Sequence, residues 1–147
     1  MARPLVPDTT AFISVFRHPE LWPALERPLR AGRVWLSSVV VAELLAGTRD
    51  VAEARHVDRL VSAMREIPPD GRILTPTPRE WAMAGRLLAR RSRLYGAVEP
   101  RNHLADVLIL LSAARIGAEI QTANLRHFQA WERLARAGGL DVVVAGV

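Results

Sequence analysis

The sequence predicts an α/β fold built on a parallel sheet. Short apolar runs alternate with longer helical patterns along the whole chain, and most helical patterns carry start or stop signals. No internal repeat, low-complexity tract or long linker interrupts this alternation. With 147 residues, half of them hydrophobic and 24% charged, the composition is that of one ordinary globular domain. We therefore expect residues 1–147 to form a single domain.

Strands are predicted where short apolar runs stand between turn signals. In chain order these runs cover 5–6, 34–36, 73–74, 119–122 and 140–145. The first run is unusual for a central strand, because Pro4 and Pro7 flank it and proline cannot donate a ladder hydrogen bond.

Helices are predicted between these strands, from apolar periodicity and from capping residues at their ends. In chain order they cover 10–17, 21–31, 38–46, 51–65, 78–95, 103–115 and 125–137. Side chains suited to cap a helix N-terminus precede four of these helices: Ser37 or Ser38, Asp50, Thr77 and Asn102.

The basic and sulfur-containing residues exclude much chemistry. All 20 basic residues are arginine, and the chain has neither lysine nor cysteine. This rules out a Schiff-base lysine, a phosphate-loop lysine, a thiol nucleophile and a cysteine-ligated metal. The formal charge of +5 suits a nucleic acid or an acidic partner, although an arginine-rich composition also arises from a GC-rich genome. The absence of cysteine, of a signal peptide and of a membrane-length apolar run predicts a cytoplasmic location away from membranes.

Three acidic residues differ from the others, which fit solvated helix faces or helix caps. Asp8 directly follows the first strand, at the sheet edge where ligands bind, although it also suits a helix N-cap. Glu43 lies inside an apolar helical run, where a carboxylate is costly unless paired or on a narrow exposed stripe. Asp106 is expected in the first turn of its helix, where the helix dipole alone also explains it. Together, carboxylates meeting at strand ends are what Mg²⁺ or Mn²⁺ requires.

Four segments resemble the motifs of PIN domains, and together they extend over nearly the whole chain. They are 6–10 with Asp8, 36–47 with Glu43, 104–117 with Asp106, and 120–128, a strand followed by Thr-x-Asn and then phenylalanine. The spacing between them is usual for the family. The resemblance implies a three-layer α/β/α fold with a central, mostly parallel sheet. In its length and in the residues of its motifs, the chain looks most like VapC-type toxins of bacterial toxin–antitoxin pairs.

The resemblance also implies an activity, that of a Mg²⁺-dependent endoribonuclease in which Mn²⁺ substitutes for Mg²⁺. Asp8 and Asp106 would be the main metal ligands, and Glu43, a less certain ligand, would complete the acidic cluster. Asn124 stands where many relatives have a fourth aspartate, and its amide brings no charge, so one metal ion is expected. The implied partners are an RNA substrate, a cognate antitoxin protein and a second copy of the chain.

Two other functions remain compatible with these residues. A PIN-like binding module acting mainly in a complex with a DNA-binding partner is compatible with the missing charge at Asn124. A processing nuclease that is not a toxin would have the same site, and only a neighbouring antitoxin gene separates it from a toxin.

Aromatic, basic and histidine residues give further expectations. Four arginines share one face of helix 78–95, as a phosphate-contacting stripe or as a plain solvated face: Arg79, Arg86, Arg90 and Arg93. On its other side Trp81 and Tyr95 are interpreted as core. Trp22 and Trp131 suit core or interface packing better than base stacking, and His103 and His127 receive no role.

An apolar patch is expected on the first two helices. They carry more large apolar side chains than such short elements can bury: Phe12, Ile13, Val15, Phe16 and Trp22. An exposed patch of this kind marks a protein interface, and the resemblance suggests an antitoxin segment as its occupant.

Overall fold

The computed structural model describes residues 2–97 and 99–147, apart from the side chains of residues 100–102. The strands are β1 (Leu5–Pro7), β2 (Leu36–Ser37), β3 (Ile73–Leu74), β4 (Glu119–Thr122) and β5 (Val143–Gly146). The helices are α1 (Thr9–Arg17), the 3₁₀ turn η1 (Pro19–Leu21), α2 (Trp22–Arg30), α3 (Ser38–Ala46), α4 (Val51–Arg65), α5 (Pro78–Tyr95), α6 (Pro100–Arg115) and α7 (Leu125–Ala137). No described helix is both long and apolar enough to cross a membrane.

The strands form one parallel layer with β1 at its centre. A three-stranded parallel sheet has the order β1-β4-β5, and β2 pairs with β3, also in parallel. A bridge between Leu5 and Val34 joins the two sheets: Leu5 N–H donates to Arg33 O and Trp35 N–H donates to Leu5 O, both at 2.8 Å. The predicted parallel sheet is confirmed.

The prolines around β1 do not prevent strand pairing. Pro7 is the last residue of β1, and the next amide, Asp8 N–H, donates to Gln121 O at 2.9 Å. At the other end, Pro4 O accepts from Glu119 N–H at 2.8 Å. Beside Pro7 the next residue supplies the N–H donor, and Pro4 takes part through its carbonyl oxygen. The hydrogen bonds to β4 therefore continue past both prolines.

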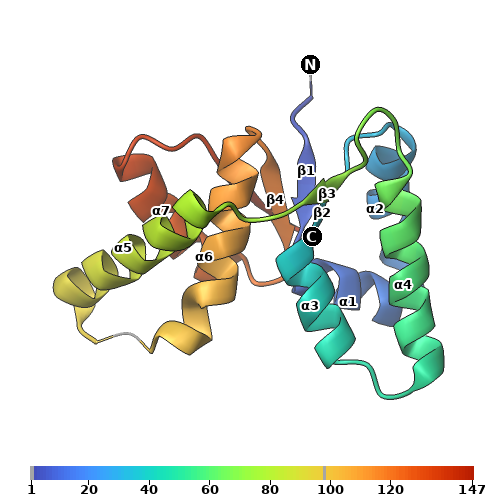
Figure 1. Cartoon of the computed structure of the whole chain (residues 1–147), viewed down its shortest axis with the longest axis horizontal. Coiled ribbons are helices and arrows are strands. Elements are labelled where there is room, and N and C mark those ends of the chain that lie inside the picture. The colour runs from blue at the N-terminus through green and yellow to red at the C-terminus, as the bar shows by residue number, and fades with distance from the viewer. Residues whose placement is uncertain (1, 98) are drawn as a thin grey trace.

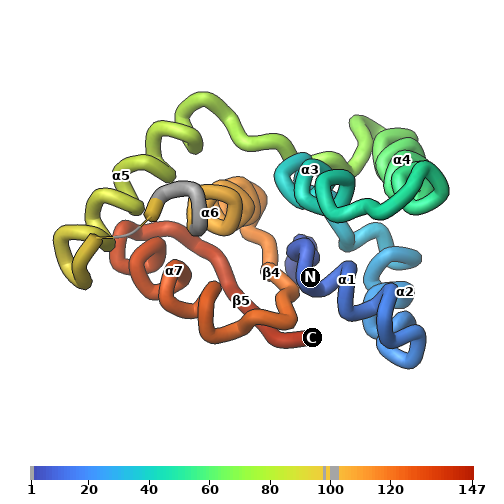
Figure 2. The backbone as a smooth tube through the Cα atoms, turned by 90° about the horizontal axis from the view of Figure 1, so that it is seen from below, coloured from blue at the N-terminus to red at the C-terminus, as the bar shows by residue number. Residues whose placement is uncertain are grey.

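Helices pack on both faces of the strand layer. Figure 1 shows α1–α4 on one side of β1 and α5–α7 on the other, and in Figure 2 helices α3 and α4 lie on the opposite side of the strands from α1 and α2. One hydrophobic core joins the strands to the helices, and it includes Val6, Leu36 and Ile120 of the strands and the buried 107–111 run of α6. This arrangement matches the three-layer α/β/α fold expected from the sequence.

The start of α6 differs from the prediction. The helix begins at Pro100, with Glu99 as its N-cap residue, so Asn102 is not its cap. Proline is favoured in the first helical turn because the backbone N–H groups of that turn have no acceptor within the helix, so the N–H that proline lacks is not missed. Asp106 consequently lies in the second turn, and the expected placement in the first turn was wrong.

The aromatic residues of α5 also differ from the prediction. Trp81 is 51% exposed and Tyr95 is 74% exposed, so neither belongs to the core. The buried side of α5 is formed instead by Glu80, Ala84 and Leu88. Trp131 is buried in the core, as the sequence suggested.

Candidate functional site

Asp8 is held at the carboxyl end of β1 by neutral donors. It is the N-cap of α1, and its Oδ1 accepts from Ala11 N–H at 2.8 Å and from the Thr10 hydroxyl at 2.7 Å. Its Oδ2 accepts from the Thr122 hydroxyl at 2.6 Å. The residue is only 3% exposed. Both proposed roles are therefore compatible in one residue, because a carboxylate that caps a helix with one oxygen retains acceptor capacity on the other.

Thr10 and Thr122 tie β1, β4 and α7 together around Asp8. Their hydroxyl oxygens are 3.2 Å apart, Ala123 N–H donates to Thr10 Oγ1 at 3.0 Å, and Asn124 N–H donates to Thr122 Oγ1 at 2.9 Å. The Thr10 hydroxyl therefore links the Asp8 carboxylate to the turn between β4 and α7.

Glu43 projects from α3 and reaches the start of α1. Ser37 caps α3 by accepting from Val39 N–H at 3.2 Å, which sets the direction of the helix. The Glu43 side chain is exposed and its Oε1 accepts from the Thr9 hydroxyl at 2.7 Å. The contact brings Glu43 beside the residue that follows Asp8.

Asp106 is the electrostatically perturbed member of the group. Its Oδ2 lies 2.7 Å from His127 Nε2, and a quarter of its side chain is exposed. The pKa of Asp106 is raised to about 6. Burial is the largest cause, the charge and hydrogen bond of His127 lower the pKa, and the negative charges of Glu43 and Asp8 raise it. A raised pKa is expected where carboxylates gather, but here burial contributes more than repulsion between them.

The three carboxylates share one electrostatic neighbourhood, although they do not form a closed metal cage. Glu43 and Asp8 both lie near enough to Asp106 for their charges to raise its pKa. Among the described residues, however, no group of three histidine or acidic side chains is arranged to hold a metal ion. Mg²⁺ commonly binds through one or two carboxylates and completes its shell with water and substrate oxygens. The donor set therefore fits such an open Mg²⁺ site and does not fit an all-protein one.

Two histidines that the sequence left without a role belong to this neighbourhood. The rings of His103 and His127 stack with centroids 5.2 Å apart and planes 19° apart, and His103 tilts against Trp131 at 5.6 Å. Burial, and then the positive charges of His127 and Arg91, lower the pKa of His103. His127 and Asp106 lie on different helices, so no local sequence pattern predicts their contact.

Asn124 lies at the beginning of α7, beside the Asp8 network. Its backbone amide donates to Thr122, while its side chain is exposed and does not cap the helix. The structure thus places the Asn124 backbone within one hydrogen bond of a residue that binds Asp8.

An apolar groove of about 730 Å³ runs between α1, α2, α3 and α4. Of the expected patch, Phe16 and Trp22 are 56% and 40% exposed and line the groove, whereas Phe12 and Val15 are core residues. Glu43 borders the same groove. The expected patch is therefore smaller than the sequence suggested, but it adjoins one of the three carboxylates.

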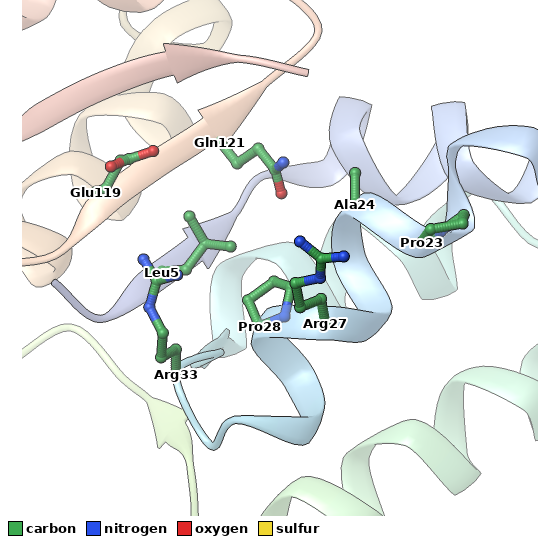
Figure 3. Close-up of a pocket in the computed structure, with 8 residues that line it drawn as sticks. All are labelled: Leu5, Pro23, Ala24, Arg27, Pro28, Arg33, Glu119 and Gln121. Atoms are coloured by element: carbon green, nitrogen blue, oxygen red, sulfur yellow. The ribbon is translucent and has the colours of Figure 1, made fainter. Parts of the chain in front are cut away.

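A separate pocket of about 480 Å³ lies between α2 and the outer face of β1 and β4. Arg27 of α2 and Gln121 of β4 point toward one another across it (Figure 3). None of the predicted site residues lines this pocket. The candidate site and this pocket are thus different places on the molecule.

Sequence and structure comparisons identify the class of protein that this fold defines. A sequence model of the PIN domain matches residues 5–134. The chain belongs to the PIN domain family. Comparison with curated protein sequences gives no match.

Solved structures with the same fold include several toxin–antitoxin proteins. DNA-bound VapBC from Salmonella typhimurium matches with a TM-score of 0.65 at 20% identity, covering 99% of this chain and 98% of that one. VapBC2 from Rickettsia felis, bound to a promoter DNA fragment, matches with a TM-score of 0.65 at 16% identity, covering 97% and 98%. VapBC-5 from Mycobacterium tuberculosis matches with a TM-score of 0.57 at 18% identity over the whole of both chains. At these identities the likeness concerns the fold.

Proposed function

We propose that this protein is a Mg²⁺-dependent endoribonuclease and the toxin of a type II toxin–antitoxin pair. The observation that carries the proposal is that three acidic residues from separate elements come together. Asp8 follows β1, Glu43 accepts a hydrogen bond from the adjacent Thr9 at 2.7 Å, and the charges of both help to raise the pKa of the partly buried Asp106. A cluster of negative charge at the ends of parallel strands is suited to a divalent cation. Membership of the PIN domain family and the fold shared with VapBC proteins support the same conclusion.

Each site residue has a distinct part in this proposal. Asp106 and Asp8 hold the cation, directly or through water, and Glu43 is the less certain third ligand. Bound Mg²⁺ supplies a water of lowered pKa and stabilises charge on the phosphodiester, and Mn²⁺ substitutes for it. Asn124 lies beside this group without a charge, which favours one metal ion over two. The +5 formal charge, carried by arginine, attracts RNA toward the acidic site.

Purified protein incubated with total cellular RNA tests this function. We expect cleavage in Mg²⁺ or Mn²⁺, loss of cleavage with EDTA, and recovery when the metal is restored. Sequencing of the cut ends then identifies the target. Cleavage that persists in EDTA, or that is equally strong in Asp106→Asn, would contradict the metal-dependent site.

The groove between α1 and α4 is the proposed seat of the antitoxin. It is apolar, Phe16 and Trp22 stay exposed along it, and Glu43 lies at its border, so a bound segment reaches toward the acidic site. A basic side chain of that segment would pair with Asp8 or Asp106 and displace the metal. The proposal also includes assembly of the protein as a homodimer and a cytoplasmic location.

Co-expression with a neighbouring small gene tests the partner. Trp22→Ala should weaken both complex formation and neutralisation of toxicity. Trp81→Ala is the matched control, because Trp81 is similarly exposed but lies on α5, away from the groove. If Trp22→Ala leaves both properties intact, the antitoxin binds elsewhere.

A second candidate function follows from the absence, among the described residues, of a three-residue metal group. The chain would then act mainly as a binding module in a complex with a DNA-binding protein. Under that function Asp106→Asn leaves the biological effect unchanged and only complex formation matters. Under the nuclease function the same variant loses the effect and keeps the complex.

A further inference from the structure

His127 contacts one oxygen of Asp106, and no side chain among the described residues donates a hydrogen bond to the other. Nε2 of His127 lies 2.7 Å from Asp106 Oδ2. An N–H on this nitrogen is present both in the protonated ring and in one neutral tautomer, so the bond does not require a charged histidine. A carboxylate held at Oδ2 has a fixed direction for Oδ1, the oxygen that remains for another partner.

The ring of His127 is itself held in place by neighbouring side chains. His103 of α6 stacks on it at 5.2 Å, and Phe128 meets it edge-on at 6.3 Å with an interplanar angle of 87°. His103 in turn rests on Trp131, a fully buried residue with the Arg91 guanidinium 4.7 Å from its ring centroid. The orientation of His127 is therefore set by the packing of α5, α6 and α7.

We propose that His127 is a positioning residue of the metal site: its Nε2–H holds Asp106 Oδ2 and so restricts the rotation of the carboxylate that would bind the cation. The inference rests on the proposed function, since it needs a cation at Asp106. Hydrogen bonds to metal-binding carboxylates restrict their rotation before the metal arrives, and loss of such partners commonly costs about 10–100-fold in metal affinity. A contact that serves only the fold would change stability and leave metal affinity alone.

Mn²⁺ binding measured by calorimetry at constant pH separates these two roles. His127→Leu should weaken Mn²⁺ binding by about 10–100-fold. His127→Gln should stay within about threefold of the natural protein, because the glutamine amide places a donor near the position of Nε2. His18→Leu is the matched control, because His18 is an exposed histidine at the end of α1. Thermal unfolding of each variant verifies that it is folded.

The results distinguish the positioning role from the proposed function. Loss in His127→Leu with retention in His127→Gln supports the inference. Unchanged Mn²⁺ affinity in folded His127→Leu overturns it, and so does an equal loss in both variants. A natural protein that neither binds Mn²⁺ nor cleaves RNA overturns the proposed function and the positioning role together. If the natural protein binds Mn²⁺ and cleaves RNA, and His127→Leu binds Mn²⁺ with the same affinity, only the positioning role is overturned.

A spectroscopic measurement without metal provides an independent readout. Long-range ¹H–¹⁵N spectra of the imidazole rings should show His127 protonated at Nε2, with a signal that moves in Asp106→Ala. The signal of His18 should stay in place in that variant. A His127 ring protonated only at Nδ1 would overturn the inference, because it would have no proton to donate to Asp106.

Discussion

Asp8, which follows β1, and Asp106 of α6 come to the candidate site from different elements, and their hydrogen-bond partners differ. Asp8 is 3% exposed and accepts hydrogen bonds from two hydroxyls and one backbone amide. Asp106 is more exposed, has the His127 ring as its partner, and has a pKa raised to about 6. The fold thus brings three hydrogen-bond donors to the Asp8 carboxylate, whereas the Asp106 carboxylate contacts the His127 ring.

The difference suggests a division of labour. Asp8 accepts three hydrogen bonds from the fold, so we expect its carboxylate to contribute to stability in addition to its proposed part in holding the cation. We expect the Asp106 carboxylate, whose pKa is raised chiefly by burial, to contribute mainly to activity. Four substitutions or conditions test this contrast.

Asp106→Asn should have the largest effect, on activity. The amide keeps the size of the side chain but removes the charge that binds the cation, so RNA cleavage should fall by about 100-fold or more. Circular dichroism should show an unchanged fold. Asp58→Asn, on the exposed face of α4, is the control and should cleave normally. A fully active Asp106→Asn would place the metal elsewhere.

Asp8→Ala should have the largest effect on stability. It removes the cap of α1 and leaves the Thr10 and Thr122 hydroxyls without their acceptor, which should cost about 1–3 kcal/mol in the free energy of unfolding by urea. Asp50→Ala also removes a helix cap, but an exposed one, and should cost less. If both variants lose the same free energy of unfolding, burial of the Asp8 hydrogen bonds does not contribute to stability.

The pH dependence of stability should reveal Asp106 in the metal-free protein. Because the folded pKa of about 6 lies above the usual aspartate value of 3.8, the fold favours the protonated form, and this stabilisation is lost as pH rises through about 6. Relative to Asp106→Asn, the natural protein should lose on the order of 1–2 kcal/mol between pH 4 and pH 7.5, measured by urea unfolding. Mg²⁺ affinity should rise over the same range. Parallel stability curves for the two proteins would contradict the raised pKa.

Asn124→Asp should have the smallest effect. A further negative charge beside the Asp8 network should tighten Mn²⁺ binding by about threefold to tenfold, because ligand charge tunes affinity for hard cations. Calorimetry measures the change, and Asn124→Ser serves as an uncharged control. Unchanged affinity would place the Asn124 side chain beyond the reach of the cation.

Much of the fold was predictable because its signals are local. The caps Ser37, Asp50 and Thr77 are where the sequence placed them, since each is decided by a few neighbouring residues. The start of α6 was predicted wrongly because Asn102 is a stronger cap by type than Glu99, while Pro100 fixes the start three residues earlier. Trp81 was predicted wrongly because helical periodicity does not say where a neighbouring element ends.

The site was predictable in part, for a related reason. Asp8, Glu43 and Asp106 stood out because each contradicts its local surroundings or follows a strand. His127 did not, since its partner Asp106 lies on another helix and the sequence between them shows no shared period. The only hint was its place in the fourth motif, just before Phe128. Contacts between side chains of different helices are visible only once the packing is known.

The pairing of the central strand sets the order in which the site is completed during synthesis. Leu5 of β1 pairs with Glu119 of β4, and the Asp8 carboxylate takes its Oδ2 partner from Thr122, 114 residues further along the chain. Contacts of such sequence separation form late, because most of the chain must be available before they close. A nascent or truncated chain that ends before β4 therefore lacks the donor that completes the Asp8 pocket. The nuclease activity proposed above would thus be absent until translation of the chain has passed β4.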